Sequence, residues 1–450
     1  MSIARPATLG LGVWLQLGLL GTLIAGAVLG LSQLKALSGA LAVLWIATQW
    51  GRLLPLARVF AGLAGAALLC VSLLTPERAP ALYTAVIQGT GFAALMMVLG
   101  LLRQPVKRAA ITQAAARTLL SVPPKRRYGA LLVGAQFMAL MFNVGIIAMI
   151  GDLTRRSEKD ADGAAAMVIA AMRGAALVSI WSPMSLGFAI VTAGVANVPA
   201  LPLVGLAFCF TVAVMAVTTR FPLLPAAARL GGASTDTRDP RAIAAVLAIA
   251  AALLGASIAL HHTSGLSFTL CAVIVLPCFA FLWLALETEA GPQRFTQALG
   301  ALGDLRNEGA LFLSANVIGA ALSLAIQSSP LWAVLSGAGF ASLPTLLILL
   351  VLIPLAAALY LPNSIMVVLA AQIFGASALG QAHPLALGLT LCIGWALAIC
   401  VNPISAMNLI VARFCNVSAA HVAHRWNLRF VLVCGAMGAC LIALVYSLGG

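Results

Sequence analysis

The chain has 450 residues, of which 62% are hydrophobic and 8% are charged. A soluble globular protein carries roughly 25% charged residues, so this composition excludes a soluble fold. The formal net charge is +14, from 25 Lys and Arg residues against 11 Asp and Glu residues. In a membrane protein such an excess marks cytoplasmic loops and does not imply nucleic-acid binding.

Apolar stretches long enough to cross a bilayer recur along the chain. A membrane helix needs about 20 apolar residues, and long uninterrupted runs favour helices over the alternating strands of a barrel. We therefore predict an all-α polytopic membrane protein with about 10–12 transmembrane helices. The expected segments are 9–31, 37–50, 53–75, 82–102, 128–150, 200–219, 242–260, 265–286, 308–327, 343–360, 363–380 and 428–448.

Basic residues predict the sidedness of the loops. The segment 103–127 carries seven basic residues and no acid, which favours the cytoplasm. The N-terminus with Arg5 and the segment 220–241 are expected on the same side, and 151–162 on the outer side. The first segment has no cleavage site after it and is expected to stay as an anchor. We expect a multi-pass protein of the bacterial inner (plasma) membrane.

Two further apolar stretches, 163–196 and 384–416, are each interrupted by a proline flanked by polar residues. The pattern G-x-A-L-x4-[SN]-P-x-S runs from Gly174 to Ser185 and recurs without a gap, 220 residues later, from Gly394 to Ser405. Proline removes a helical hydrogen bond, and paired interrupted segments in two repeats indicate the binding site of a secondary transporter. Ordinary proline kinks in packed helices are the alternative.

This arrangement resembles the ion transporter superfamily, whose members have two repeats, each with a re-entrant hairpin that carries small polar residues and proline at the substrate site. The resemblance covers about residues 128–448 and rests on Ser182-Pro183-Met184-Ser185 and Asn402-Pro403-Ile404-Ser405. It implies two Pro-broken re-entrant hairpins. The Ser-Asn-Thr tips of the dicarboxylate-carrying branch are absent, so the resemblance implies neither dicarboxylates nor Na⁺ coupling.

We expect a single transmembrane domain over residues 1–450. It would contain N-terminal helices and a basic cytoplasmic loop (1–127), a first repeat with a hairpin at 163–196 (128–241), and a second repeat with a hairpin at 384–416 (242–450). Inverted repeats need an odd number of crossings between the two hairpins, whereas six expected segments lie there. Either 345–375 is one long broken crossing, or another of the expected segments is wrong.

The candidate residues for binding substrate or ion lie in and near the two interrupted stretches. Arg173, in an otherwise apolar stretch, either attracts an anion or reaches toward the interface. Asn408 follows the second proline cluster and is either a ligand or an interhelical hydrogen-bonding residue. The full set is Ser182, Pro183, Ser185, Asn402, Pro403, Ser405, Asn408 and Arg173. We expect Ser182, Ser185, Asn402 and Ser405 to converge around one cavity.

The sequence gives little support for a cation-binding carboxylate, a metal or cofactor site, or an enzyme active site. The acids lie in loops or at the ends of spans, which argues against a cation-binding carboxylate in mid-membrane. The nine cysteines lack metal-ligand spacing, and we assign neither a disulfide, a metal nor a cofactor. Walker, G-x-S-x-G and HExxH motifs are absent. The histidines His261, His262, His383, His421 and His424 look like loop or span-end residues.

These observations predict a secondary active transporter that moves a small anionic organic solute by alternating access, driven by a Na⁺ or H⁺ gradient. The expected partners are the solute, the coupling ion and membrane lipid, with a homodimer left open. One alternative is a lipid-linked glycan flippase, which would need a large cationic cavity. Another is a membrane-embedded enzyme that uses loop histidines.

Overall fold

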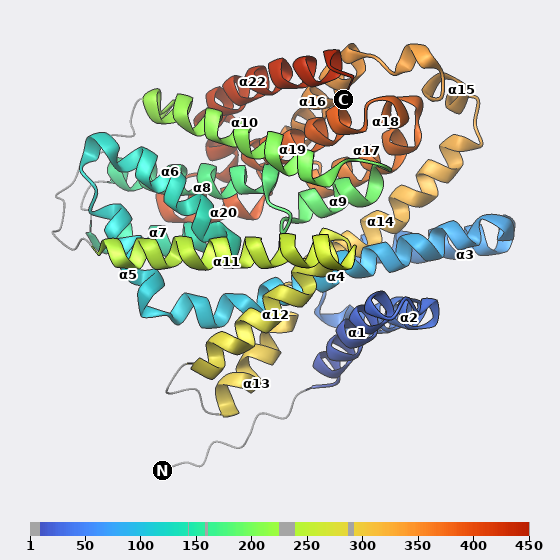
Figure 1. Ribbon diagram of the computed structural model, residues 1–450, viewed down its shortest axis with the longest axis horizontal. Coiled ribbons are helices and arrows are strands. Elements are labelled where there is room, and N and C mark those ends of the chain that lie inside the picture. Colours follow the sequence, from blue (N-terminus) through green and yellow to red (C-terminus); the bar gives the residue numbers. More distant parts are fainter. Residues whose placement is uncertain (1–9, 143, 158–160, 225–238, 287–291, 450) are drawn as a thin grey trace. The chain divides into compact units, whose positions relative to one another are not determined.

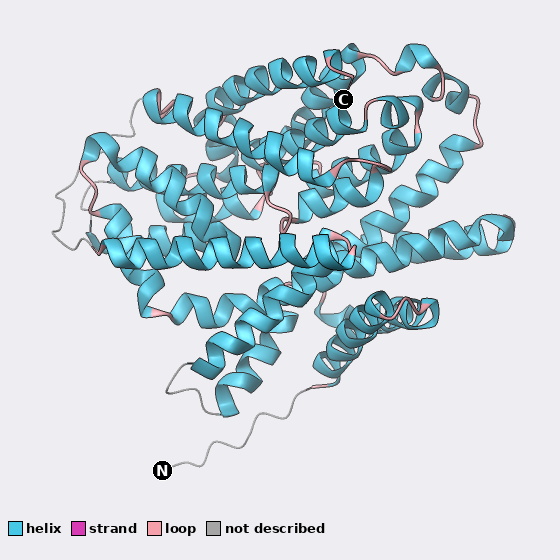
Figure 2. Ribbon diagram, in the orientation of Figure 1, coloured by secondary structure: helices cyan, strands magenta, loops and turns pink. Residues whose placement is uncertain are grey.

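The computed structural model describes residues 10–142, 144–157, 161–224, 239–286 and 292–449 (Figure 1). Within these ranges every regular element is a helix, and none is a strand (Figure 2). Ten of the described segments are long and apolar enough to cross a membrane. The predicted all-α polytopic class is therefore confirmed.

The chain divides into two compact units, each made of two stretches of sequence. The first unit comprises residues 1–108 and 253–325, and the second comprises 109–252 and 326–450. The predicted boundaries near residues 127 and 241 stay predictions, because compactness does not test a sequence repeat.

The first unit is built from apolar helices whose few polar side chains bind backbone carbonyls. Its helices are α1 (Leu11–Val28), α2 (Ser32–Gln49), α3 (Pro55–Leu74), α4 (Ala79–Arg108), the second half of α11 (Pro240–Ser264), α12 (Phe268–Leu286), α13 (Pro292–Gly300) and most of α14 (Arg306–Gln327), with short 3₁₀ turns η1 (Trp50–Arg52), η2 (Pro76–Arg78) and η3 (Ala301–Gly303). Asn316 Nδ2 donates to the carbonyl of Ala85 at 2.8 Å. Such bonds hold helices together in lipid, where water offers no competing partner.

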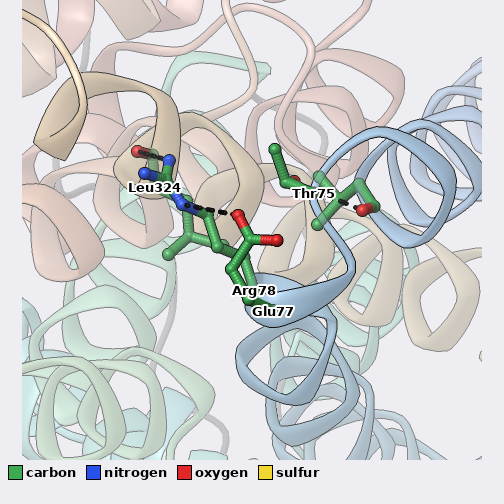
Figure 3. Close-up of polar contacts among 5 residues, drawn as sticks. Thr75, Glu77, Arg78 and Leu324 are labelled. Carbon is green, nitrogen blue, oxygen red and sulfur yellow. Dashed lines mark hydrogen bonds and ion pairs between the residues drawn. The ribbon is translucent and has the colours of Figure 1, made fainter.

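Glu77 and Arg78, in the turn between α3 and α4, make the polar contacts shown in Figure 3. Arg78 Nε lies 4.0 Å from Glu77 Oε1, and Arg78 Nη1 donates to the carbonyl of Leu324 at 3.4 Å. The Glu77 and Arg78 side chains are exposed, so this ion pair adds little stability.

The second unit contains both interrupted stretches. Its helices are α5 (Ala110–Leu120), α6 (Pro124–Phe142), α7 (Gly145–Ser157), α8 (Ala161–Trp181), α9 (Leu186–Gly194), α10 (Ala200–Arg220), the first half of α11, α15 (Leu331–Leu335), η4 (Ala338–Phe340), α16 (Leu343–Ala358), α17 (Asn363–Ala376), α18 (Ala378–Ala382), α19 (Pro384–Val401), α20 (Ala406–Cys415), α21 (Ala419–His421), the π-helix η5 (Val422–Trp426) and α22 (Leu428–Ser447).

Helices of the second unit fall into two sets with matching contacts. Helix α6 packs on α8 as α16 packs on α19, and α10 packs on α8 as α22 packs on α19. The sets also interlock, because α7 packs on α20 of the other set and α17 packs on α9. Each set therefore completes its packing only with the other.

The hairpins lie before the interrupted stretches rather than within them. Helices α16 and α17 pack on each other, with Leu359 to Pro362 between them. The segment 128–150, expected as one span, is two helices, α6 and α7, that also pack together. Beyond the breaks, by contrast, α9 continues away from α8 and α20 continues away from α19 (Figure 1). The interrupted stretches are thus broken helices, which corrects the expectation that they fold back on themselves.

This arrangement changes the number of expected crossings. Among the described residues, five candidate spans lie between the α6–α7 and α16–α17 hairpins, an odd number, and inversion of the two repeats stays a prediction. They are Gly163–Gly194, Ala200–Arg220, Pro240–Ser264, Phe268–Leu286 and Arg294–Gln327. The option of one long broken crossing at 345–375 is wrong, because α16 and α17 form a hairpin.

The position of the α6–α7 hairpin also changes one predicted side of the membrane. A hairpin returns to the side where it began, and α6 begins at Pro124, within the basic segment 103–127. We therefore expect 151–157 on the same side as that segment and not outside. The rest of the predicted external loop includes 158–160, which lie outside the described residues.

Candidate functional site

The first break comprises residues 182–185, between α8 and α9. Pro183 has no amide hydrogen, so the carbonyl of Ser179 loses its helical partner. Ser185 replaces that partner, since its Oγ donates to the Ser179 carbonyl at 3.1 Å. The same hydroxyl caps α9 by accepting from the amide of Phe188 at 3.3 Å. Ser182 Oγ accepts from the amide of Met184 at 3.3 Å.

The second break comprises residues 402–405, between α19 and α20, and has the same design. Pro403 frees the carbonyl of Ile399, to which Ser405 Oγ donates at 2.9 Å. Ser405 also caps α20 by accepting from the Asn408 amide at 3.3 Å. Asn402 Oδ1 accepts from the amide of Ile404 at 3.0 Å. The shared pattern [SN]-P-x-S therefore encodes a helix break whose freed backbone groups are satisfied locally.

The tip of the α16–α17 hairpin docks on the second break. Asn402 Nδ2 donates to the carbonyl of Leu361 at 3.1 Å. His424 Nε2 lies 3.0 Å from the carbonyl of Ala358, and its ring packs edge-on against Tyr360. Tyr360 has a φ of 66°, an unusual conformation for a bulky residue. The strained tip is thus held by the break and by the π-helix η5.

The glycine of each sequence repeat allows the hairpin to approach its broken helix. Gly174 of α8 lies directly against the backbone carbonyl of Leu132 in α6, leaving no room for a Cβ atom. Its counterpart Gly394 in α19 faces the side chain of Ile353 in α16, 3.3 Å from the position of a Cβ. Small residues are the usual means of close helix contact in membranes.

Arg173 is buried and fully bonded to protein. Its Nε donates to Asn427 Oδ1 at 3.1 Å. Its Nη1 donates to Tyr128 Oη at 3.0 Å and to the carbonyl of Pro222 at 2.8 Å. Its Nη2 donates to the carbonyls of Leu223 at 3.2 Å and Trp426 at 2.8 Å.

Those bonds use all five N–H groups of the Arg173 guanidinium. The cation also lies 4.7 Å from the ring centre of Phe430. The side chain is buried and leaves no N–H group open to a solute. An arginine that attracts an anion by its charge and an arginine at the interface both stay predictions.

Asn408 lies inside the second break rather than beside it. Its Nδ2 is 3.1 Å from the carbonyls of Ile399 and Cys400, 2.8 Å from that of Asn402, and 3.1 Å from Ser405 Oγ. Asn427, at the start of α22, donates from Nδ2 to Asn408 Oδ1 at 3.4 Å. Arg173, Asn408 and the second break are therefore brought together through Asn427.

The two breaks have different neighbours, and the expected convergence of Ser182, Ser185, Asn402 and Ser405 around one cavity stays a prediction. The first break lies near Trp395 of α19, whose indole contacts Gly187. The second break lies near Met172 and Arg173 of α8, because Asn427 bonds both of these and the Cys400 carbonyl. Arg173 precedes Ser182 by nine residues, about 13 Å along a helix. The breaks are thus offset along the α8–α19 pair.

Buried polar atoms without a hydrogen-bond partner occur on α6, α8 and α10, which pack on one another. They include Nε2 and Oε1 of Gln136 in α6, Nε1 of Trp181 in α8 and Oγ1 of Thr211 in α10. Trp181 is the last helical residue before the first break, and its ring packs edge-on against Phe208 of α10. Unsatisfied buried polar groups are costly and are typical of sites that bind water or a ligand.

Sequence reasoning missed Asn427, Tyr128, Gln136 and Thr211. Asn427 carried one usable signal, since it directly precedes the last apolar run. The other three are single polar residues within apolar helices, where hydrogen bonding between helices is the commoner role. The predicted loop histidines have local contacts: His261 Nδ1 is 2.7 Å from the carbonyl of Leu266. His383 packs against Tyr446, and His421 against Trp426.

No family model and no curated protein matches the sequence. Among solved structures, the chain is similar to the YdaH transporter of Alcanivorax borkumensis, whose crystal structure is described as having an unusual topology. The TM-score is 0.50, the identity is 17%, and the match covers 82% of this chain and 89% of that chain. At this identity the likeness concerns the fold, and it shows that the chain is folded like a polytopic membrane transporter.

Proposed function

We propose that the protein is a secondary active transporter that moves a small organic anion across the bacterial inner membrane by alternating access. The observation that carries the proposal is the pair of proline-broken helices, each facing a hairpin, in two interlocked sets. Broken helices at corresponding places in two repeats are how many secondary transporters build their binding sites. The fold shared with a solved transporter supports the same function.

The first break is the proposed solute site. Ser182, Pro183 and Ser185 open the backbone there, and α9 directs its N-terminal amides and partial positive charge toward the break. The unpaired donor of Trp181 lies directly before the break, and that of Gln136 lies on α6, whose backbone is beside Gly174 of α8. Together these groups favour a solute that accepts hydrogen bonds, such as a carboxylate. Arg173 contributes its charge at a distance and no direct bond.

The second break, with Asn402, Pro403, Ser405 and Asn408, forms the other half of the proposed machinery. Its α20 N-terminus has the same polarity as that of α9. A Na⁺ or H⁺ gradient would drive accumulation of the solute. Membership of the ion transporter superfamily is part of this proposal and rests on the interrupted helices and the paired hairpins.

Uptake into proteoliposomes tests the proposal. Purified protein is reconstituted, and a panel of labelled organic acids is offered with an imposed Na⁺ gradient, an imposed H⁺ gradient or neither. We expect at least one acid to accumulate only with a gradient. Folded protein that accumulates none of them under any gradient would contradict the proposal.

Thiol accessibility locates the site. Ser185→Cys and Ser405→Cys are made in a cysteine-free background and treated with membrane-impermeant reagents from each side. Labelling of Ser185→Cys should depend on the side and should decrease when the transported acid is present. If the acid leaves labelling unchanged, the first break is not where it binds.

A further inference from the structure

Three buried side chains of the second unit form a relay whose hydrogen bonds all run in one direction. Arg173 Nε donates to Asn427 Oδ1 at 3.1 Å, and Asn427 Nδ2 donates to Asn408 Oδ1 at 3.4 Å. Asn408 Nδ2 then faces the oxygens of the second break at 2.8–3.1 Å. The relay ends with its donor group inside the break.

The chemistry of arginine fixes the direction of this relay. A guanidinium only donates, so Asn427 must turn its oxygen toward Arg173 and its NH₂ group away. Asn408 must then present its own oxygen to that NH₂ group and its own NH₂ group to the break. All three residues have solvent exposures of 0%, and bonds in such a medium polarise one another. Arg173 thereby holds a polarised donor against the second break.

The surroundings of the Asn408 amide resemble a cation site. An NH₂ group has two hydrogens, yet four oxygens lie within 3.1 Å of this nitrogen: three backbone carbonyls and the hydroxyl of Ser405. Uncharged oxygens in such numbers are the ligands that hard cations prefer, and unwound helices of transporters offer them. At the second break, the Nδ2 atom of Asn408 occupies the position among these oxygens that a cation would take.

The first break lacks such a group. In the ungapped repeat, the residue that corresponds to Asn408 is Phe188, which has no polar side chain. Within the part of the chain that the structure describes, the Ser179 carbonyl there receives one side-chain hydrogen bond, from Ser185, whereas the Ile399 carbonyl receives bonds from both Ser405 and Asn408. The two breaks therefore share a hydrogen-bonding pattern of the backbone, but the second contains the amide of Asn408 where the first has Phe188.

We infer that Asn408 is a positioning residue that takes the place of a cation at the second break, held in that role by Arg173 through Asn427. The second break is thereby closed to free cations, and the NH₂ group of Asn408 places a fixed partial positive charge there. This role in transport rests on the proposed function, but the occupancy of the break by Asn408 can be tested without it.

The test is to remove the amide and supply a cation. Asn408→Asp places a carboxylate among the oxygens, and Asn408→Ala leaves the oxygens without their donor. Full-length protein in detergent at pH 8 is melted in NaCl and in choline chloride of equal ionic strength, with tryptophan fluorescence as the readout. We expect Na⁺ to raise the midpoint of at least one variant by about 5 °C more than it raises that of the wild type.

Asn316→Asp is the matched control. Asn316 is also buried and donates to a backbone carbonyl, and it lies within the uninterrupted helix α14. Its variant should lose stability equally in both salts. Recovery of an Asn408 variant only from Na⁺-containing buffer also supports the inference. The inference is wrong if Na⁺ raises the unfolding midpoint of both Asn408 variants by no more than it raises that of the wild type. It is also wrong if neither variant can be recovered even in Na⁺.

The outcomes separate this inference from the proposed function. A Na⁺-dependent midpoint in an Asn408 variant, with no solute transported by the wild type, leaves the inference standing and removes the proposed function. Transport by the wild type, with no such midpoint shift in an Asn408 variant, leaves the proposed function standing and removes the inference.

Discussion

The Nε atom of Arg173 lies 3.1 Å from Oδ1 of Asn427, although 254 residues separate the two in sequence. This bond joins α8 of one set of helices to the start of α22 in the other. A buried arginine usually has a carboxylate partner, but this one is balanced by carbonyls, an amide and a phenol. Its role is therefore expected to be architectural.

Replacing Arg173 by lysine should destabilise the protein. A lysine keeps the charge but has three donors on one nitrogen, so several acceptors lose their partner. We expect the free energy of unfolding to fall by about 2–4 kcal/mol, as measured by thermal or denaturant unfolding in detergent. Arg155→Lys, at an exposed arginine that also bonds a carbonyl, is the control and should have little effect. A stable Arg173→Lys protein with weakened solute binding would instead assign Arg173 to the solute.

The two repeat glycines should respond differently to alanine. At Gly174 the new methyl group would collide with the backbone carbonyl of Leu132, which cannot move without shifting α6. We expect a loss of about 1–3 kcal/mol in Gly174→Ala and a smaller loss in Gly394→Ala, where the Ile353 side chain can adjust. Unfolding midpoints of the two variants compare the sites directly. Equal losses would show that α6 and α16 approach their partners equally closely.

The capping serines should also differ. Ser185→Ala removes the cap of α9 and leaves the Ser179 carbonyl without its side-chain donor. Ser405→Ala removes the cap of α20, but Asn408 still bonds the Ile399 carbonyl. We expect a cost of about 2–4 kcal/mol for Ser185→Ala and about 1 kcal/mol for Ser405→Ala. Ser185→Thr, which keeps the hydroxyl, should recover most of the loss, and its failure to do so would contradict the explanation.

Restoring an amide at the first break should abolish transport without unfolding the protein. In Pro183→Ala the new N–H can bond the Ser179 carbonyl and let α8 continue into α9. We expect an unchanged or raised unfolding midpoint, together with loss of gradient-driven uptake. Pro277→Ala, at a proline inside the uninterrupted helix α12, is the control and should still transport. Normal uptake by Pro183→Ala would show that the break is dispensable.

The sequence predicts the breaks better than the hairpins. Proline flanked by serine or asparagine has local consequences, so Ser182-Pro183 and Asn402-Pro403 interrupt their helices as expected. Helices α6 and α7, which pack together, share the single apolar segment expected at 128–150. Hydropathy is equally high in a hairpin and in a crossing, and it therefore cannot distinguish them.

The contacts of the candidate site could be predicted only in part. Arg173 was identified because a charge in an apolar stretch is conspicuous, but its partners come from residues 128, 222, 223, 426 and 427. Three of those contacts are to backbone carbonyls, which any residue type supplies. Composition and spacing therefore carry no information about them.

Interlocking of the two sets has a consequence for biosynthesis. At 5–20 residues per second, roughly 10–50 s pass between synthesis of Arg173 and of Asn427. During that time α8 carries an arginine whose insertion at the centre of a bilayer costs about 2.5–3.5 kcal/mol. Helix α9 likewise lacks its packing partner until α17 has been synthesised, and α7 lacks its partner until α20 has been synthesised. The nascent first set should therefore be retained by the insertion machinery or a membrane chaperone, and chains that terminate before α20 should be degraded rather than accumulate.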